Sequence, residues 1–417
     1  MNQPKHKLFI FYFTFVRKYL VISSNIILVV LIKKPYKITI IVFIVLIVVI
    51  PIVLPIFLIF NQNELINVNI ELLFNGDEAY TYVADQMGIN TTSYRIPGTK
   101  GREECAQYFI DKFQQINPLI DHSLHNFTIL SVECQNVLFK MNENYTNIVI
   151  LGAHYDSRAK ATKDTTNPNL PVPGANDGAS GCAVLIELAE VLYSRLNNLS
   201  VQIWFLFFDA EDQGYDLGAG IPGWDWVEGS EQFVLEIDNF YNSSKEDFDA
   251  MILLDMVGGT NLRFINEQHS TSSLLNELFE IGRQLGFTNA FPLDPIVGTI
   301  TDDHVAFLNY GIPSADLIIK FWNQPAEWPY HHTTGDDISH ISNNSLEITG
   351  KTVEQFIYNN YYDTTDQYQG NFPWKDDFNL LDSELFIFIV IILPIIGLAV
   401  VILWFRSRLM KKSLESY

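Results

Sequence analysis

The sequence predicts an α/β fold: a single domain with a mostly parallel sheet covered by helices on both faces, flanked by transmembrane helices. First, short apolar runs alternate with helical patterns between residues 61 and 384, as in strands joined by crossover helices. Second, uncharged apolar stretches at residues 38–60 and 385–405 lie on either side of that region. Third, the composition is globular, because 48% of the 417 residues are hydrophobic and only 3 are Cys.

The elements of the middle region follow from the spacing of its apolar residues. Helices are expected at residues 101–115, 182–196, 273–286 and 346–358. Strands are expected at the short apolar runs, residues 147–151, 201–208, 251–254 and 314–319. Residues 211–230 are rich in Gly and Trp without periodicity, so we expect a loop there. One domain is favoured over two because α/β enzymes often reach this size.

Residues 38–60 and 385–405 are each long enough to cross a bilayer, which takes about 20 apolar residues in a helix. Basic residues precede the first stretch and follow the second, and positively charged flanks stay in the cytoplasm. We therefore expect an integral membrane protein, bound to the lipid bilayer through two spans, with residues 61–384 as its exterior domain. Residues 1–37 are then a cytoplasmic or interfacial segment and residues 406–417 a cytoplasmic tail.

Other features of the sequence bear on this placement. Residues 8–32 are apolar but split by a basic pair, so an interfacial helix is expected, with a third membrane span as the alternative. Cys105 and Cys134 could pair in an exterior domain, whereas Cys182 lies in an apolar helical pattern and is expected in the core. Glycosylation sequons occur only in the middle region, at Asn90, Asn126, Asn144, Asn198, Asn242 and Asn343.

The charge balance argues against a nucleic-acid-binding protein, which needs a basic face. The chain has 26 Lys and Arg against 48 Asp and Glu, a net charge of −22, and residues 1–60 contain no acidic residue. The acidity therefore belongs to the middle region, where it favours solubility. Attraction of positively charged peptides is the alternative interpretation of this charge.

Polar side chains follow three of the expected strands. His154 and Asp156 follow the first, Glu211 and Asp212 the second, and Asp255 the third. Ligand sites of parallel sheets lie beyond the carboxyl ends of the strands. We therefore expect these side chains to converge on one crevice, although each of them alone is more typical of a turn or a solvated loop.

Two further residues complete a candidate metal site. Asp177 lies in the loop GANDGASG, which opens a helix, and His332 lies in the late loop YHHTTGDD. Histidines and carboxylates without Cys are typical of catalytic zinc sites. If Asp212 binds the metal, Glu211 is held beside it and can take a proton from water whose pKa the metal lowers to about 7.

Six sequence blocks resemble the zinc aminopeptidases and glutaminyl cyclases that form the twenty-eighth metallopeptidase family. The resemblance covers roughly residues 85–360 and implies a single α/β domain with a twisted mixed sheet, acting on peptide or protein N-termini. The blocks are HYDSR at 154–158, PGANDGASG at 173–181, FFDAEDQG at 207–214, LLDMVGG at 253–259, TDDHVAFLNYGIP at 301–313 and HTTGD at 332–336.

For a two-zinc aminopeptidase, the resemblance assigns a role to each of these residues. Glu211 is the general base, and Asp156 orients the ring of His154. One zinc is bound by His154 and Asp255, the other by Asp212 and His332, and Asp177 bridges them. The match to HTT selects His332 rather than His331 as the ligand.

For a glutaminyl cyclase, the resemblance implies one zinc, held by Asp177, Asp212 and His332. Glu211 then shuttles a proton, with Asp255 and Asp302 joined to it by hydrogen bonds.

Two positions discriminate between the reactions. Asp302 stands where aminopeptidases usually have Ser, which favours the cyclase. His331 stands where cyclases usually have Trp, and every ligand of a two-metal site is present. Together these two observations favour aminopeptidase-type hydrolysis slightly. A third alternative, an inactive binding ectodomain, is disfavoured because no metal or base position is lost.

Overall fold

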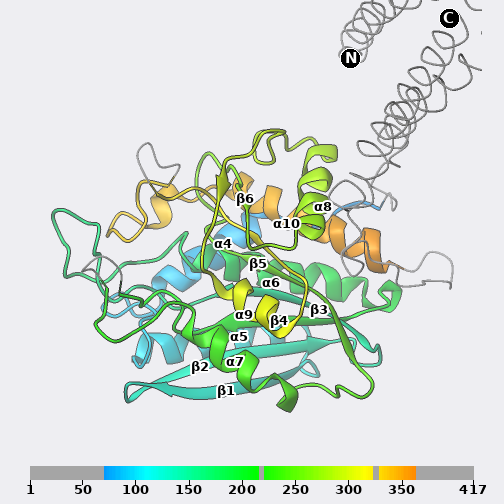
Figure 1. The fold of residues 1–417 in the computed structure, drawn as a ribbon, viewed down its shortest axis with the longest axis horizontal. Coiled ribbons are helices and arrows are strands. Elements are labelled where there is room, and N and C mark those ends of the chain that lie inside the picture. Colours follow the sequence, from blue (N-terminus) through cyan, green and yellow to red (C-terminus); the bar gives the residue numbers. More distant parts are fainter. Residues whose placement is uncertain (1–69, 216–219, 323–327, 363–417) are drawn as a thin grey trace, which may run out of the picture. The chain divides into compact units, whose positions relative to one another are not determined.

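The computed structural model describes residues 70–215, 220–322 and 328–362, which belong to one compact unit (Figure 1). Its helices are α4 (Gly76–Gly88), α5 (Lys100–Ile116), α6 (Ala179–Ser194), α7 (Glu228–Leu235), α8 (Ser272–Gln284), α9 (Asp303–Tyr310) and α10 (Asn343–Tyr361). Its strands are β1 (Asp121–Ile129), β2 (Val132–Met141), β3 (Asn147–His154), β4 (Gln202–Phe208), β5 (Asp247–Leu254), β6 (Asn266–Glu267), β7 (Val297–Gly298) and β8 (Ser314–Leu317).

The main sheet is mixed, with the strand order β1-β2-β4-β3-β5-β8. Strands β4, β3, β5 and β8 are parallel, whereas β2 runs antiparallel to both β1 and β4. This agrees with the mostly parallel sheet expected from the sequence. The register aligns the strand ends, because His154 at the end of β3 pairs with Phe208 at the end of β4. The residues that follow β3 and β4 therefore leave the sheet side by side.

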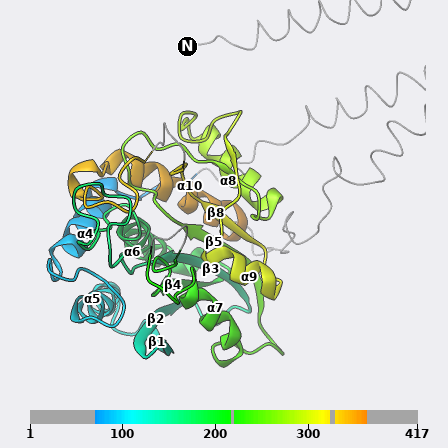
Figure 2. The same ribbon diagram turned by 60° about the vertical axis from the view of Figure 1, so that its left-hand side comes forward.

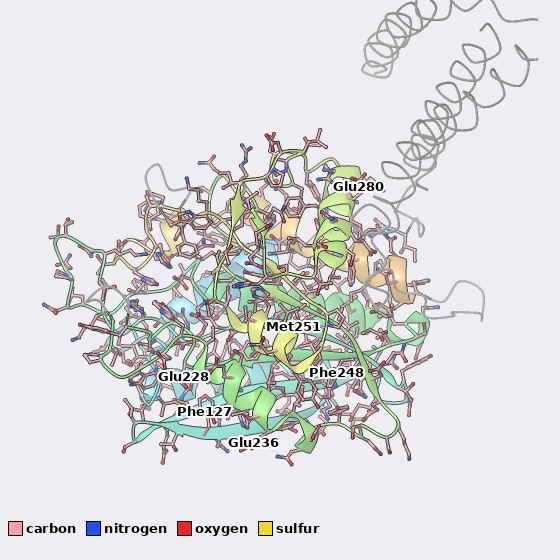
Figure 3. The ribbon with its side chains drawn as sticks, in the orientation of Figure 1. Phe127, Glu228, Glu236, Phe248, Met251 and Glu280 are labelled. Atoms are coloured by element: carbon pink, nitrogen blue, oxygen red, sulfur yellow. The ribbon has the colours of Figure 1, made fainter. Side chains whose placement is uncertain are left out.

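Helices cover both faces of the sheet (Figure 2). On one face α4, α5, α6 and α10 enclose the larger core, while α7 and α9 pack on the other face. Side chains along each strand alternate between the two cores, as a pleated strand requires. In β5, for example, Met251 belongs to the smaller core with α7 and α9 (Figure 3), and the next residue, Ile252, faces the larger core.

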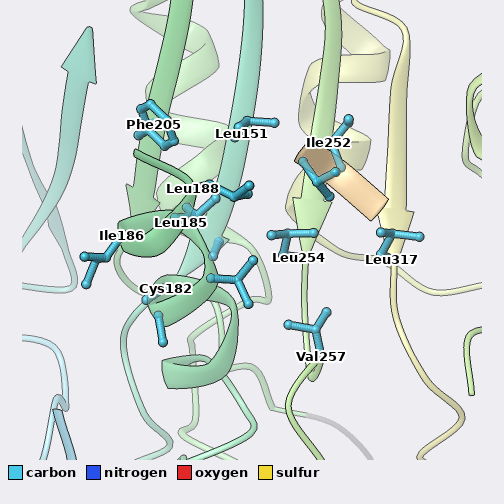
Figure 4. Close-up of a cluster of buried hydrophobic side chains, with 14 of the residues drawn as sticks. Leu151, Cys182, Leu185, Ile186, Leu188, Phe205, Ile252, Leu254, Val257 and Leu317 are labelled. Carbon is cyan, nitrogen blue, oxygen red and sulfur yellow. The ribbon is translucent and has the colours of Figure 1, made fainter. Parts of the chain in front are cut away.

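Helix α6 lies at the centre of the larger core because most of its side chains are apolar. In Figure 4, Leu185 and Leu188 of α6 lie next to Leu151 of β3. Close approach to β5 requires Gly181, since a Cβ there would come within 2.1 Å of the Leu254 carbonyl oxygen. This contact holds the start of α6 against the carboxyl ends of the parallel strands.

The expectation of flanking transmembrane helices is corrected, and with it the integral-membrane placement and the role of the lipid bilayer. Within 70–215, 220–322 and 328–362, no helix has the length and apolar character needed to cross a membrane. The most apolar of these helices, α6, has 16 residues, includes Glu187 and Glu190, and buries its apolar surface against the sheet. The described residues form the α/β domain. The stretches 38–60 and 385–405 lie outside the described residues, as do 1–37 and 406–417.

The three cysteines are all free thiols. Cys105 on α5 and Cys134 on β2 are buried, and the pairing considered for them does not form. Cys182 is a buried residue of α6, as expected from its apolar surroundings.

Candidate active site

The carboxyl ends of the parallel strands bring the expected site residues together. His154 ends β3, Asp255 follows β5 directly, and Glu211 and Asp212 follow β4. Asp177 immediately precedes Gly178, the residue that caps α6. All of the expected metal ligands are buried, with exposures of 1% for His154, 4% for Asp177, 2% for Asp212, 7% for Asp255 and 5% for His332.

The first half of the site is built around His154. Its Nε2 lies 3.2 Å from Asp177 Oδ1 and 3.3 Å from Asp255 Oδ1. On the other side of the ring, Nδ1 lies 3.4 Å from Asp156 Oδ1. The imidazole is therefore fixed between one orienting carboxylate and two that converge on the opposite nitrogen, an arrangement typical of a metal-binding histidine with its supporting carboxylate.

The second half is built around His332. Its Nε2 lies 2.9 Å from Asp212 Oδ1 and 3.8 Å from Asp177 Oδ2. Asp177 therefore has one oxygen in each half. The neighbouring His331 also points its Nε2 at Asp177 Oδ2, at 3.8 Å.

Asp156 ties the two strand ends together. Its carboxylate accepts the backbone N–H groups of Glu211 and Asp212, at 3.0 and 3.2 Å, and the side-chain amide of Gln213 at 2.9 Å. Burial acts to raise the pKa of Asp156, but the neighbouring His154 ring and the hydrogen bonds from Gln213 and the Glu211 backbone together outweigh burial and lower this pKa. The charged Asp156 thus positions the Glu211–Asp212 pair as well as the His154 ring.

Glu211 and Asp302 are acidic groups that line the same cavity as the candidate ligands. Burial raises the pKa of Glu211 well above its ordinary value, and the charge of Asp302 raises it further. Burial and the charge of Asp255 raise the pKa of Asp302 to about 7. Asp302 also caps α9, since its Oδ1 accepts the backbone N–H of Asp303 at 2.7 Å. Such groups can take up and return protons near neutral pH.

Two residues that the sequence analysis left without a role support the ligands. Arg158 donates to the Asp212 backbone oxygen at 2.6 Å and approaches Asp212 Oδ1 at 3.3 Å. Asp336 accepts the backbone N–H groups of Asn176 and Asp177, at 2.9 and 3.1 Å. Arg158 is the last residue of the block HYDSR and Asp336 the last residue of HTTGD. Their place in these family-like blocks could have identified them from the sequence.

The cavity has a volume of about 450 Å³ and is lined by both acidic and aromatic side chains. Its acidic lining consists of Asp177, Glu211, Asp212, Asp255 and Asp302. The aromatic lining consists of Trp226, Phe321 and Trp322. Trp226 also stacks on His332, with ring centroids 5.8 Å apart. A side chain of modest size fits such a space with its polar end at the acidic wall.

The donor set fits zinc. Burial and the charge of Arg158 hold the pKa of His332 well below its ordinary value, so this imidazole is neutral and offers a lone pair, as coordination requires. Asp212 Oδ2 is buried without a hydrogen-bond partner, as expected for an oxygen available to a cation. His154, Asp177 and Asp255 offer ligand atoms that all lie within 4.8 Å of one another, as do Asp177, His331 and His332. Nitrogen and carboxylate donors in this arrangement are those of catalytic zinc sites.

A parallel sheet that carries buried carboxylates and histidines at its carboxyl edge defines a metal-dependent α/β enzyme. Residues 136–357 match Peptidase family M28. The chain belongs to this family, which confirms the resemblance drawn from the sequence blocks.

The relatives include both reactions considered above. The chain is 26% identical over 312 residues to glutaminyl-peptide cyclotransferase of Dictyostelium discoideum, covering 63% of this chain and 80% of that protein. It is 29% identical over 225 residues to aminopeptidase YwaD of Bacillus subtilis, covering 52% of this chain and 42% of that protein.

Solved structures give the same result. Bacteroides thetaiotaomicron glutaminyl cyclase matches with a TM-score of 0.61 and 27% identity, over 69% of this chain and 98% of that one. A Zn-dependent exopeptidase from Parabacteroides distasonis matches with a TM-score of 0.60 and 28% identity, over 68% and 98%. The chain is thus a zinc-dependent enzyme of the aminopeptidase and glutaminyl cyclase group, as the sequence predicted.

Proposed function

We propose that the chain is a glutaminyl-peptide cyclotransferase, which closes the N-terminal glutamine of a peptide into a ring and releases ammonia. The observation that carries this proposal is the third acidic group of the cavity, Asp302. Its Oδ2 is buried without a hydrogen-bond partner, beside Asp255 and in the same cavity as Glu211. Cyclisation moves a proton from the attacking amine to the departing ammonia, and carboxyl groups beside Glu211 can assist this transfer. The match to the D. discoideum cyclase, which covers 80% of that protein against 42% for the B. subtilis aminopeptidase, supports this choice.

In the proposed reaction the substrate α-amine attacks the carbon of its own side-chain amide. The new carbon–nitrogen bond closes the ring, the old carbon–nitrogen bond breaks, and ammonia leaves. Glu211 takes the proton from the attacking nitrogen and returns it to the departing one, a task suited to its raised pKa. Asp255 and Asp302 hold the second half of this proton path. A zinc ion bound by Asp177, Asp212 and His332 would polarise the amide carbonyl.

The aromatic wall favours cyclisation in a second way. Trp226, Phe321 and Trp322 line the same cavity as the acidic groups. The attack is intramolecular, because the amine and the amide belong to the same residue. Apolar rings around the substrate side chain would exclude competing water and hold the amine near the amide.

Aminopeptidase-type hydrolysis is the second candidate, and one observation favours it. His154, Asp177 and Asp255 form a compact donor group whose ligand atoms lie within 4.8 Å of one another. A second zinc bound there would give the paired-metal arrangement that clamps an attacking and a leaving oxygen. In that case Glu211 takes a proton from water rather than from the substrate amine.

A substrate comparison with the full-length protein tests the proposal. We expect peptides that begin with Gln to release ammonia with ring closure, and matched peptides that begin with Leu to remain intact. Elemental analysis is expected to give one zinc per chain. Release of free Leu together with two zinc ions per chain would instead establish the hydrolase.

Replacing Asp302 by Asn is expected to lower kcat for cyclisation by about 100-fold, within the range for loss of an acid–base group. KM and zinc content should stay near their normal values, because Asp302 is not among the proposed ligands. Steady-state kinetics with a Gln-initiated peptide measure the effect. The exposed Asp294 provides the control, since Asp294→Asn makes the same chemical change away from the cavity. Full activity in Asp302→Asn would remove this residue from the proton path.

A further inference from the structure

Two adjacent histidines, His331 and His332, face the metal-binding carboxylate of Asp177. Each places its Nε2 at 3.8 Å from Asp177 Oδ2, and the two rings stack with centroids 3.6 Å apart. Both are buried, at 7% and 5% exposure. Proximity to Asp177 therefore does not decide which imidazole coordinates a cation.

Lys163 makes different contacts with the two histidines. The backbone N–H of Lys163 donates to the carbonyl oxygen of His332 at 3.1 Å. Its ammonium group lies 2.5 Å from Nδ1 of His331. An ammonium is a donor only, so Nδ1 of His331 must be the acceptor in this bond. A neutral imidazole has one proton, and that proton is then on Nε2.

A protonated nitrogen has no lone pair to offer a cation. Nε2 is the nitrogen of His331 that faces Asp177, so in this tautomer His331 presents an N–H group to the site. We propose that Lys163 fixes His331 as a hydrogen-bond donor of the substrate cavity and leaves zinc coordination to His332. The inference holds for either reaction, because it concerns the wall of the cavity rather than the bond that is broken.

The His331 ring lies where its Nε2–H group could donate a hydrogen bond to a bound substrate. His331 lines the cavity, and its ring packs against Phe321 with centroids 4.3 Å apart. The 3.8 Å separation from Asp177 exceeds the usual length of a hydrogen bond, so the N–H is not committed to that carboxylate. A carbonyl oxygen of the bound peptide is the acceptor that every N-terminal substrate provides next to its reacting groups.

A second contact keeps this arrangement in place. Asp164 Oδ2 accepts both the backbone N–H and the hydroxyl of Thr334, so the Lys163 loop is tied to the histidine loop beyond the pair as well as at the pair itself. His332 has a φ of 57°, a left-handed conformation that is costly for a residue with a Cβ and persists only where the surroundings enforce it. The Lys163 loop supplies that enforcement.

The adjacent histidines make a matched pair of variants, His331→Phe and His332→Phe, in the full-length protein. Zinc affinity is measured by competition with a chelator, and KM with the N-terminal peptide substrate that the enzyme turns over. We expect His331→Phe to keep zinc affinity within about 2-fold and to raise KM about 10-fold, the effect of one lost hydrogen bond. For His332→Phe we expect at least about a 100-fold loss of zinc affinity, beyond the range for supporting residues.

Two more variants separate a donor role from a merely structural one. His331→Gln restores an N–H donor and is expected to recover most of the KM lost in His331→Phe. Lys163→Met is expected to raise KM without changing zinc affinity, since it releases the His331 ring. The proposal is overturned if His331→Phe loses zinc as severely as His332→Phe, or if Lys163→Met leaves KM unchanged. The zinc measurements do not depend on which reaction the enzyme catalyses, so they stand even if cyclisation is disproved.

Discussion

Replacing Glu211 by Gln is expected to lower kcat by about 10³-fold, within the range for removal of a general base, while zinc remains bound. Gln has nearly the same shape, so the cavity keeps its form, but its amide cannot take up a proton from a nucleophile. Both candidate reactions need a group that takes up this proton. Glu211 is assigned to it because it follows β4 next to Asp212 and is not among the proposed ligands. Burial already raises the pKa of Glu211 well above its ordinary value, as a proton carrier at neutral pH requires.

The matched control is Glu231→Gln on the exposed side of α7, which makes the same change far from the chemistry. Turnover of a Gln-initiated peptide and zinc per chain are measured for both variants. Normal turnover in Glu211→Gln would show that another group is the base. Loss of zinc in the same variant would mean that Glu211 acts as a ligand instead.

The parallel half of the sheet was predictable because its strands are buried on both faces. Residues of β4 are buried throughout. After Gln202 the strand appears in the sequence as an unbroken apolar run, IWFLFF, and its bounds were predicted within one residue. β3 and β5 were located in the same way. The prediction missed the first four residues of β5, which begin with the polar Asp247, and the last three residues of β3. Continuous apolar runs of this length are typical of strands covered by helices on both sides.

The antiparallel edge of the sheet could not be predicted in this way. β1 is an edge strand, and its burial alternates irregularly along DHSLHNFTI, so polar and apolar residues mix without a clear period. The short helices α7 and α9 were also missed. α9 begins within the block TDDH, where Asp303 and His304 are buried polar residues, and buried polar residues hide an apolar helical pattern.

The site was predictable where chemistry is carried by residue type, and unpredictable where it depends on backbone contacts. His154, Asp177, Asp212, Asp255 and His332 could be named because strand ends and loop motifs select carboxylates and histidines. Arg158 and Asp336 support the candidate ligands by hydrogen bonds to the backbone. Such bonds leave no spacing rule in a sequence, so only the place of these residues inside the sequence blocks could have pointed to them. The bond from Lys163 to His331 joins residues 168 positions apart and becomes visible only after folding.

Asp177 is the residue on which both halves of the candidate metal site depend. Its Oδ1 lies 3.2 Å from His154 Nε2, and its Oδ2 lies 3.8 Å from His332 Nε2. Gly178 follows it with a φ of 120°, and a Cβ there would lie 2.5 Å from the His154 carbonyl oxygen. Glycine therefore allows the backbone to bring Asp177 this close to the end of β3.

Replacing Asp177 by Asn is expected to weaken zinc binding by at least about 100-fold and to abolish turnover, a larger effect than the 10–100-fold typical of supporting residues. The amide has one acceptor oxygen and no charge, so it cannot serve both halves of the site. Asp336→Asn is the graded comparison, because Asp336 only holds the backbone of Asp177 and should weaken zinc binding about 10-fold. Chelator competition on both proteins measures the difference. Equal losses would mean that Asp177 acts through the loop conformation, and unchanged zinc affinity in Asp177→Asn would remove it from the ligand set.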